Sequence, residues 1–153
     1  GLTGVRVLGP DPAALQEDDR DGSLWQALPD HCCHLRKVVP LAAGLAGFDA
    51  WITGRKRSQA ATRHSLPVIE ADGNGRIKIN PLATWSHANI ATYFRVHDLP
   101  RHSLEAQGYR SIGCLPCTDR VHEGEDPRAG RWRHAAKTEC GIHQHVPPFG
   151  ACF

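Results

Sequence analysis

The stretch Phe48-Asp-Ala-Trp-Ile-Thr-Gly-Arg-Lys-Arg-Ser-Gln59 joins a short apolar run to a charged loop. The run from Phe48 to Thr53 predicts a buried strand that ends before Gly54. Open α/β sheets bind ligands beyond the carboxyl ends of their strands, which is where Gly54 to Gln59 would lie. The stretch therefore predicts a strand of an α/β sheet together with the edge of that sheet at which a ligand binds.

A β-hairpin is predicted directly after this stretch. Pro67-Val-Ile-Glu70 and Arg76-Ile-Lys-Ile79 flank Asp72-Gly-Asn-Gly75, whose residues are typical of a tight turn. A further short strand is predicted from Val5 to Leu8. Strands that alternate with helical segments favour a mixed or parallel α/β sheet flanked by helices.

Helices are predicted on both sides of these strands. The polar segment from Asp11 to Asp30 predicts one or two short helices. Apolar residues recur at helical spacing from Cys33 to Leu45, with Pro40 as a start or a kink. Ser86 is predicted to cap a helix that runs to about His97.

The last part of the chain has weaker signals. A short helix is predicted from Ser103 to Gln107, before Gly108. Residues 118–153 are rich in glycine, proline and charge, and predict loop with one helical turn near Trp132. We expect residues 1–118 to form the main body with any metal site, and residues 119–153 to form a mobile loop and C-terminal tail.

Composition excludes several classes of protein. The 153 residues suit one domain, and the net charge of +2 has no long basic block, so we expect no nucleic-acid partner. No long apolar run predicts a membrane segment. Six cysteines are too few for a secreted disulfide scaffold of this length, so we expect thiols in a reducing, cytoplasmic compartment.

Four of the cysteines form two close pairs, which predict a four-thiolate metal site. Cys32 and Cys33 are adjacent, and Cys114 and Cys117 have the Cys-x-x-Cys spacing. Adjacent side chains diverge, which suits separate irons of a [4Fe-4S] cluster better than a single zinc ion. A vicinal disulfide and two unrelated buried thiols remain alternatives. We expect the adjacent pair at the N-terminal end of its helix, where the dipole favours thiolate.

The fifth cysteine predicts a nucleophile. Cys140 precedes Gly141 and has Lys137 and His143 within three residues, and nearby cations favour the reactive thiolate. An incidental loop cysteine is the alternative. Lys37, one helical turn after Cys33, could face the metal site and an anionic ligand, although an exposed lysine is the commoner meaning. Cys152 has no such setting, and no role is assigned to it.

Five motifs in order closely resemble the assimilatory sulfonucleotide reductases, and together they span nearly the whole chain. The motifs are Cys32-Cys-His-Leu-Arg-Lys-Val-Val-Pro-Leu41, Trp51-Ile-Thr-Gly-Arg-Lys-Arg-Ser-Gln59, Gly108-Tyr-Arg-Ser-Ile-Gly-Cys-Leu-Pro-Cys-Thr118, Glu125-Asp-Pro-Arg-Ala-Gly-Arg-Trp132 and Lys137-Thr-Glu-Cys-Gly-Ile-His143. Both cysteine pairs are typical of the adenylyl sulfate branch with its [4Fe-4S] cluster. The resemblance implies an adenine-nucleotide α-hydrolase-like fold.

The resemblance also implies a reaction. The Cys140 thiolate would attack the sulfur of adenylyl sulfate, AMP would leave, and thioredoxin or a similar dithiol would release sulfite from the S-sulfocysteine. The family positions implied to bind the substrate are Lys37, Gly54, Arg63, Arg128, Arg131 and His143. The Gly-containing turn at Arg128 to Arg131 predicts a lid that closes with the Cys140 tail over the substrate.

One departure from the family and two other functions stay open. No match exists to the family's Ser-Gly-Gly-Lys-Asp-Ser type of nucleotide loop, so we expect the chain to be the carboxyl-terminal two thirds of such a reductase. A phosphoadenylyl sulfate reductase that retains the cluster is one alternative. A non-catalytic zinc module with four cysteine ligands is the other, and the sequence indicates no oligomeric state.

Overall fold

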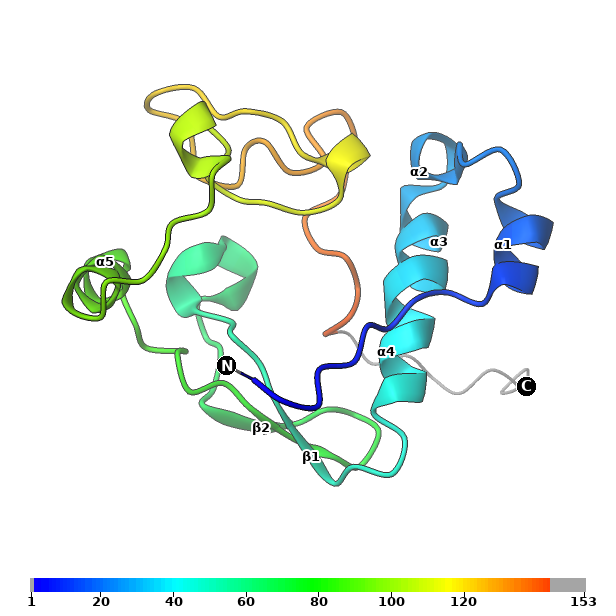
Figure 1. Ribbon diagram of the computed structural model, residues 1–153, viewed down its shortest axis with the longest axis horizontal. Helices are drawn as coiled ribbons and strands as arrows, with labels where there is room; N and C mark the ends of the chain where they lie inside the picture. The colour runs from blue at the N-terminus through cyan, green and yellow to red at the C-terminus, as the bar shows by residue number, and fades with distance from the viewer. Residues whose placement is uncertain (1, 144–153) are drawn as a thin grey trace. The chain divides into compact units, whose positions relative to one another are not determined.

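The computed structural model describes residues 2–143, and its chain divides into two compact units. Unit 1 consists of residues 1–48 and 137–153, and unit 2 consists of residues 49–136. Figure 1 shows the elements of both units. Cys152 lies outside the described residues, and the predicted boundary at residue 118 stays a prediction.

Unit 1 is helical. Helix α1 (Pro12–Asp18) begins at Asp11, whose side chain accepts a hydrogen bond of 2.9 Å from the Ala13 amide. Helix α2 (Leu24–Ala27) follows. Helix α3 (Pro29–Cys33), a π-helical turn (His34–Val38) and helix α4 (Val39–Gly44) then form one continuous rod, seen in cyan in Figure 1. These elements confirm the short helices predicted before Asp30.

The rod confirms the helix predicted up to Leu45 but begins earlier than expected. Its π-helical turn precedes Pro40, which has no N–H to donate and whose ring crowds the preceding turn, so a widened turn accommodates it. We predicted that the cysteine pair lies at the N-terminal end of its helix, but the rod begins at Pro29, before the pair. The Cys32 amide already donates to the Leu28 carbonyl at 2.9 Å, so that amide is not available to a thiolate.

The strand predicted from Val5 to Leu8 is absent. These residues have no strand assignment, and Val5 and Val7 are 71% and 95% exposed. A strand needs a neighbour to satisfy its N–H and C=O groups. No other segment of residues 2–143 pairs with this one, so the apolar alternation alone does not produce a strand.

Unit 2 contains a small mixed sheet, as the alternation of strands and helices predicted. Its strands are β1 (Ala50–Ile52), β2 (Ile69–Ala71) and β3 (Ile77–Ile79), in the order β1-β3-β2. Strand β3 is parallel to β1 and antiparallel to β2. The β2–β3 pair confirms the predicted hairpin, whose turn is closed by Asp72 accepting from the Asn74 and Arg76 amides at 2.8 and 3.2 Å.

The two faces of this sheet are unlike. The register brings Trp51, Lys78 and Glu70 into one cross-strand row, and Lys78 is only 3% exposed. On the opposite face Ile52 and Ile69 are 70% and 63% exposed. The prediction that the strand from Phe48 to Thr53 is buried is therefore wrong, because the described residues bury the polar row and leave the aliphatic face in solvent.

Unit 2 also contains short helices, which precede and follow the strands β2 and β3 in the sequence. Short 3-10 helices cover Arg57–Gln59, Ala61–Arg63, Glu105–Gln107 and Leu115–Cys117. Helix α5 (His87–Val96) begins at Ser86, which accepts from the Asn89 amide, and so confirms the predicted cap. Gly108 ends its helix with a φ of 91°.

The segment after Cys117 is loop, as predicted, although the helical turn expected near Trp132 is absent. Its one described pairing is an isolated bridge between Thr118 and Arg131. Over the described residues, no helix has the length and apolar character needed to cross a membrane.

Candidate functional site

The adjacent cysteines lie where α3 passes into the π-helical turn. Cys32 is partly exposed and Cys33 is 5% exposed. Burial raises the pKa of the Cys33 thiol above its ordinary value, while the positive charges of Lys37 and Lys137 lower it less strongly. Burial therefore opposes the thiolate form that the helix position was predicted to favour at Cys33. The thiol form is favoured because the buried sulfur lacks solvation.

The C-terminal motif belongs to the same unit as this pair. Lys137, whose side chain is 6% exposed, forms an ion pair with Asp30 of α3. The charge of Cys140 also acts on Cys33 and raises its pKa. Unit 1 therefore brings Cys140 within electrostatic range of the cysteine pair, although more than 100 residues separate them in the sequence.

The two remaining predicted residues of this unit are Lys37 and His143. The charge of Lys37 acts on Cys33, as its helical spacing predicted. His143 is half-buried in the turn after Gly141. Gly141 has a φ of 88°, a left-handed conformation that favours glycine. The motif therefore requires glycine at this position for backbone reasons.

Arg36 is a contact of the cysteine pair that the sequence analysis missed. Its Nη1 lies 3.8 Å from the Cys32 sulfur and 2.5 Å from Asp19 Oδ2. Asp19 is 1% exposed at its side chain and also accepts from the Leu24 amide at 2.8 Å. Because Arg36 follows Cys32 by four residues, helical spacing was a signal that could have found it.

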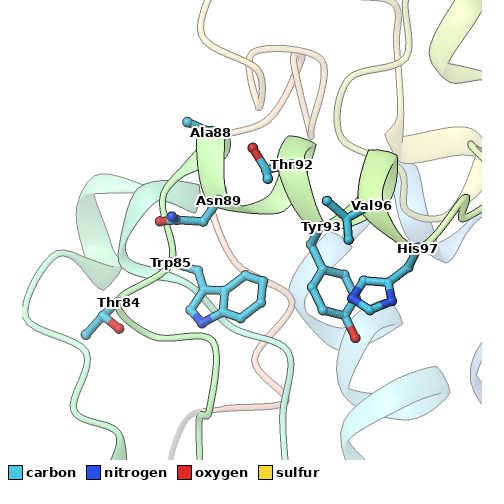
Figure 2. Close-up of a pocket in the computed structure, with 8 residues that line it drawn as sticks. All are labelled: Thr84, Trp85, Ala88, Asn89, Thr92, Tyr93, Val96 and His97. Atoms are coloured by element: carbon cyan, nitrogen blue, oxygen red, sulfur yellow. The ribbon is translucent and has the colours of Figure 1, made fainter.

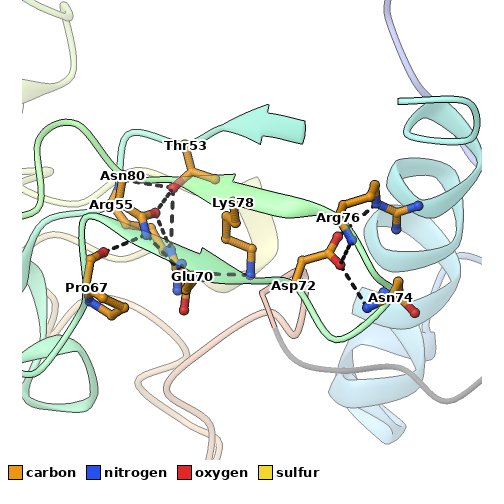
Figure 3. A network of polar contacts seen from close by, with 9 residues as sticks. All are labelled: Thr53, Arg55, Pro67, Glu70, Asp72, Asn74, Arg76, Lys78 and Asn80. Carbon is orange, nitrogen blue, oxygen red and sulfur yellow. Dashed lines mark hydrogen bonds and ion pairs between the residues drawn. The ribbon is translucent and has the colours of Figure 1, made fainter. Parts of the chain in front are cut away.

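The predicted ligand edge of unit 2 carries a buried polar network, which Figure 3 shows. The Thr53 hydroxyl donates to Asn80 Oδ1 at 2.5 Å, and the Asn80 amide donates to Glu70 Oε1 at 2.9 Å. Arg55 forms an ion pair with the same carboxylate. Asn80 is fully buried. The network fixes the backbone on both sides of Gly54, and the sequence analysis assigned no role to Arg55 or Asn80.

Cations follow Gly54 in the same loop. Arg63 donates to Gln59 Oε1 at 2.7 Å, and that oxygen also accepts from the Lys56 amide at 2.9 Å. Burial lowers the pKa of Lys56, and the charge of Arg63 lowers it further. A Cβ built on Gly54 would meet no atom within 4 Å, so its Cα faces open space. Such a cationic loop with an accessible backbone is suited to binding an anion.

The Cys-x-x-Cys motif forms a compact loop in unit 2. Cys114 precedes the 3-10 turn Leu115–Cys117, and the Cys117 amide donates to the Cys114 carbonyl at 3.0 Å. The Thr118 hydroxyl donates to the same carbonyl at 2.8 Å and accepts from the Gly113 amide at 3.1 Å. These bonds close the loop on itself and leave both thiols partly exposed.

The Arg128–Trp132 turn packs on that loop. The Asp119 amide donates to the Gly130 carbonyl at 2.8 Å, and the Trp132 amide donates to the Cys117 carbonyl at 3.1 Å. A Cβ on Gly130 would lie 2.1 Å from the Asp119 oxygen, so only glycine allows this approach. The Arg131 guanidinium lies against Gly113. The predicted lid turn is therefore in contact with the predicted metal-binding loop.

The donors that the two cysteine pairs offer fit a thiolate-bound metal. Of the described residues, five cysteines are thiols outside any disulfide. No group of three or more histidine, cysteine, aspartate or glutamate side chains within residues 2–143 is placed to hold a metal ion. The four predicted ligands divide between the two units, two in each. Thiols in two pairs close in sequence agree with the donor chemistry of an iron-sulfur cluster.

A separate hollow lies along α5, and Figure 2 shows the side chains around it. Trp85 and Tyr93 meet edge to face with ring centroids 5.4 Å apart, and Tyr93 stacks on His97 at 4.2 Å. None of the predicted site residues lines this hollow.

Comparisons with known proteins agree with the motifs. The family model described as "Phosphoadenosine phosphosulfate reductase domain" matches residues 1–120. The adenosine 5'-phosphosulfate reductase of Mesorhizobium japonicum is 57% identical over 94% of this chain and 56% of its own length. That of Chelativorans sp. is 50% identical over 94% of this chain and 58% of its own length.

Two further relatives carry the name of the other sulfonucleotide. The phosphoadenosine 5'-phosphosulfate reductase of Gloeobacter violaceus is 46% identical over 91% of this chain and 59% of its own length. The crystal structure of phosphoadenylyl-sulfate reductase from Candida auris in its phosphate complex has a TM-score of 0.56 and 34% identity, covering 78% of this chain and 54% of that one. This chain thus spans less than two thirds of the length of each relative.

Proposed function

This chain belongs to the phosphoadenosine phosphosulfate reductase domain family, and we propose that it is the part of an adenosine 5'-phosphosulfate reductase that carries the nucleophile. The observation that carries the proposal is the ion pair of Lys137, three residues before Cys140, with Asp30 of α3, the helix that contains Cys32 and Cys33. Relatives named adenosine 5'-phosphosulfate reductase at 50% to 57% identity support the substrate.

The reaction proceeds in two displacements. The Cys140 thiolate attacks the sulfur of adenylyl sulfate, the bond from sulfur to the bridging oxygen breaks, and AMP leaves with that electron pair. The product is an S-sulfocysteine. A thiolate of thioredoxin or a similar dithiol then attacks the Cys140 sulfur, sulfite leaves, and the second thiol of the reductant resolves the mixed disulfide.

Cations bind the anionic substrate in this proposal. The predicted contacts are Lys37, Arg63, Arg128, Arg131 and His143, together with the backbone at Gly54. The position of Lys56 and Arg63 in one loop, both bonded to Gln59, and the open space at Gly54 support an anion near this loop. Arginine suits the task because its planar guanidinium binds phosphate or sulfate oxygens with two hydrogen bonds.

We assign Cys32, Cys33, Cys114 and Cys117 as ligands of a [4Fe-4S] cluster. Side chains of adjacent helical residues point about 100° apart, which suits bonds to different irons. The cluster supplies structural and electrostatic support when bound. Anaerobic purification with iron and sulfide analysis tests this: we expect about four irons per chain, and their loss in Cys33→Ser, whereas stoichiometric zinc would support the zinc module.

Trapping the adduct tests the nucleophile. The chain is incubated with adenylyl sulfate labelled at sulfur and analysed without reductant. We expect label on wild type and on the matched control Cys152→Ser, none on Cys140→Ser, and release as sulfite on addition of thioredoxin. Label that stays on Cys140→Ser would falsify the assignment.

A second candidate substrate is phosphoadenylyl sulfate. The Gloeobacter violaceus relative, at 46% identity, bears that name. Labelling rates with the two sulfonucleotides, measured on the same preparation, decide between them. Faster labelling by phosphoadenylyl sulfate would replace the first proposal with this one.

A further inference from the structure

We propose that Arg131 is a positioning residue that holds the Cys114–Cys117 loop in its ligand-binding shape. The inference rests on the proposed function only for the identity of the metal. We call these contacts the brace. They lie within unit 2 and join the Arg131 guanidinium to the backbone that precedes Cys114.

The first contact is the approach of the guanidinium to Gly113. A Cβ on Gly113 would lie 2.3 Å from Arg131 Nη2 and 2.4 Å from Cζ. Real Cβ atoms do not approach other atoms so closely, so any side chain at residue 113 would displace the arginine. The residue before Cys114 therefore has to be glycine for the guanidinium to lie flat on the chain.

The second and third contacts fix the guanidinium from its other sides. Nη1 donates to the Ile112 carbonyl at 3.1 Å, and Cζ lies 4.4 Å from the centre of the Trp132 ring. The Trp132 side chain is 5% exposed. The arginine is thus held between a buried indole and the loop backbone, where a planar cation gains both stacking and hydrogen bonding.

The backbone contacts show that this arrangement is imposed from outside the turn. Trp132 has a φ of 49°, which a non-glycine residue adopts only when its surroundings require it. Its amide donates to the Cys117 carbonyl, and Arg131 pairs with Thr118 in a β-bridge. The turn is therefore fastened at both ends of the cysteine loop, with Arg131 at Gly113 and Trp132 at Cys117.

The consequence is a link between the two predicted tasks of the Arg128–Trp132 turn. Arg128 carries the proposed contact to substrate. Its amide donates a hydrogen bond to the Asp126 side chain at 2.7 Å and not to the cysteine loop. Arg131 is the residue of the turn whose side chain packs on the loop, at Ile112 and Gly113. Its replacement should release Cys114 and Cys117 while leaving Cys32 and Cys33 as they are.

The test compares the reactivity of four cysteines in one molecule. The metal-free, reduced chain is treated with a maleimide, and the rate at each cysteine is followed by peptide mass spectrometry. Because Arg131→Ala removes a hydrogen bond and a stacked contact, we expect alkylation of Cys114 and Cys117 to become about tenfold faster, with Cys32 and Cys33 unchanged. The matched control is Arg133→Ala, two residues along the chain from Arg131, which breaks the ion pair of Arg133 with Glu125. It should change the alkylation rate of none of the four cysteines.

Two further variants separate the brace from general damage. Gly113→Ala keeps the charge but displaces the guanidinium, so it should reproduce the Arg131→Ala pattern. Arg131→Lys can donate to Ile112 but cannot stack as a plane, so its rates should be intermediate. Rates equal to wild type in Arg131→Ala and Gly113→Ala, an equal rise at all four cysteines, or full rescue by lysine would each overturn the proposal.

Iron retention provides the second measurement. In the iron-loaded chain, visible absorbance after addition of a chelator should decay about tenfold faster in Arg131→Ala than in Arg128→Ala. Equal decay in the two variants contradicts the brace. If wild type holds no iron, the cluster assignment fails, whereas the alkylation pattern still decides the brace.

Discussion

Cys32 and Cys33 lie on a continuous helical rod in unit 1, whereas Cys114 and Cys117 lie on a short loop in unit 2. The helix pair is placed by the backbone ladder, in which each amide bonds to a carbonyl a turn away. The loop pair is placed by side chains, including Thr118 from the same motif and Arg131 from a later one. A local signal in the sequence can therefore predict the first arrangement but not the second.

The largest expected effect is on the helix pair. Asp19→Ala removes a carboxylate that pairs with Arg36 and accepts from the Leu24 amide. We expect the free energy of unfolding to fall by about 3 kcal/mol, because a half-buried cation and a buried amide lose their partner. Chemical denaturation followed by circular dichroism measures it. Asp18→Ala, at an exposed pair with His31, is the control and should cost at most about 1 kcal/mol; equal losses would contradict the buried role of Asp19.

A smaller and more local effect is expected at the loop pair. Thr118→Val removes the hydroxyl that bonds both Gly113 and Cys114. We expect a loss of about 1 kcal/mol, with faster amide exchange confined to the loop and no change at the helix pair. Thr92→Val on the exposed surface of α5 is the control. Exchange that accelerates equally in both units would show that the two pairs are not held independently.

The smallest effect concerns protonation of the helix pair. Burial raises the pKa of Cys33 above its ordinary value, so the folded chain keeps this proton at a pH where the unfolded chain loses it. The stability that Cys33 contributes is therefore complete below the unfolded pKa and is lost as the pH rises through the folded pKa. The pH profile of Cys33 alkylation, in a variant whose other cysteines are serine, should have its midpoint at a higher pH in the folded chain than in the same chain unfolded by denaturant. Equal midpoints, or a lower one in the folded chain, would contradict burial as the dominant cause.

Local patterns predicted those elements whose contacts lie within the element. The Ser86 cap, the 72–75 turn and the rod around Pro40 all depend on neighbours a few residues away. The strand predicted at Val5 to Leu8 failed because pairing depends on a neighbouring segment, which the pattern does not specify. The prediction that the strand from Phe48 to Thr53 is buried failed for the same reason.

The candidate site divides in the same way. Lys37 was found from helical spacing, and Arg36 could have been found from the same spacing. The return of Cys140 to the unit of Cys33 was not predicted, because no periodicity links residues so far apart. Arg131 was predicted as a substrate contact, whereas its packing on Gly113 depends on two loops that meet only in the folded chain.

The sheet of unit 2 buries polar side chains and exposes aliphatic ones, which affects how freely its positions can vary. Ile52 and Ile69 already lie largely in water, so polar replacements there remove little buried surface. Asn80 is fully buried and has four polar partners, so even an isosteric change would leave acceptors and donors unsatisfied. Among the described residues, the buried polar positions of this sheet should therefore tolerate substitution less well than its exposed isoleucines.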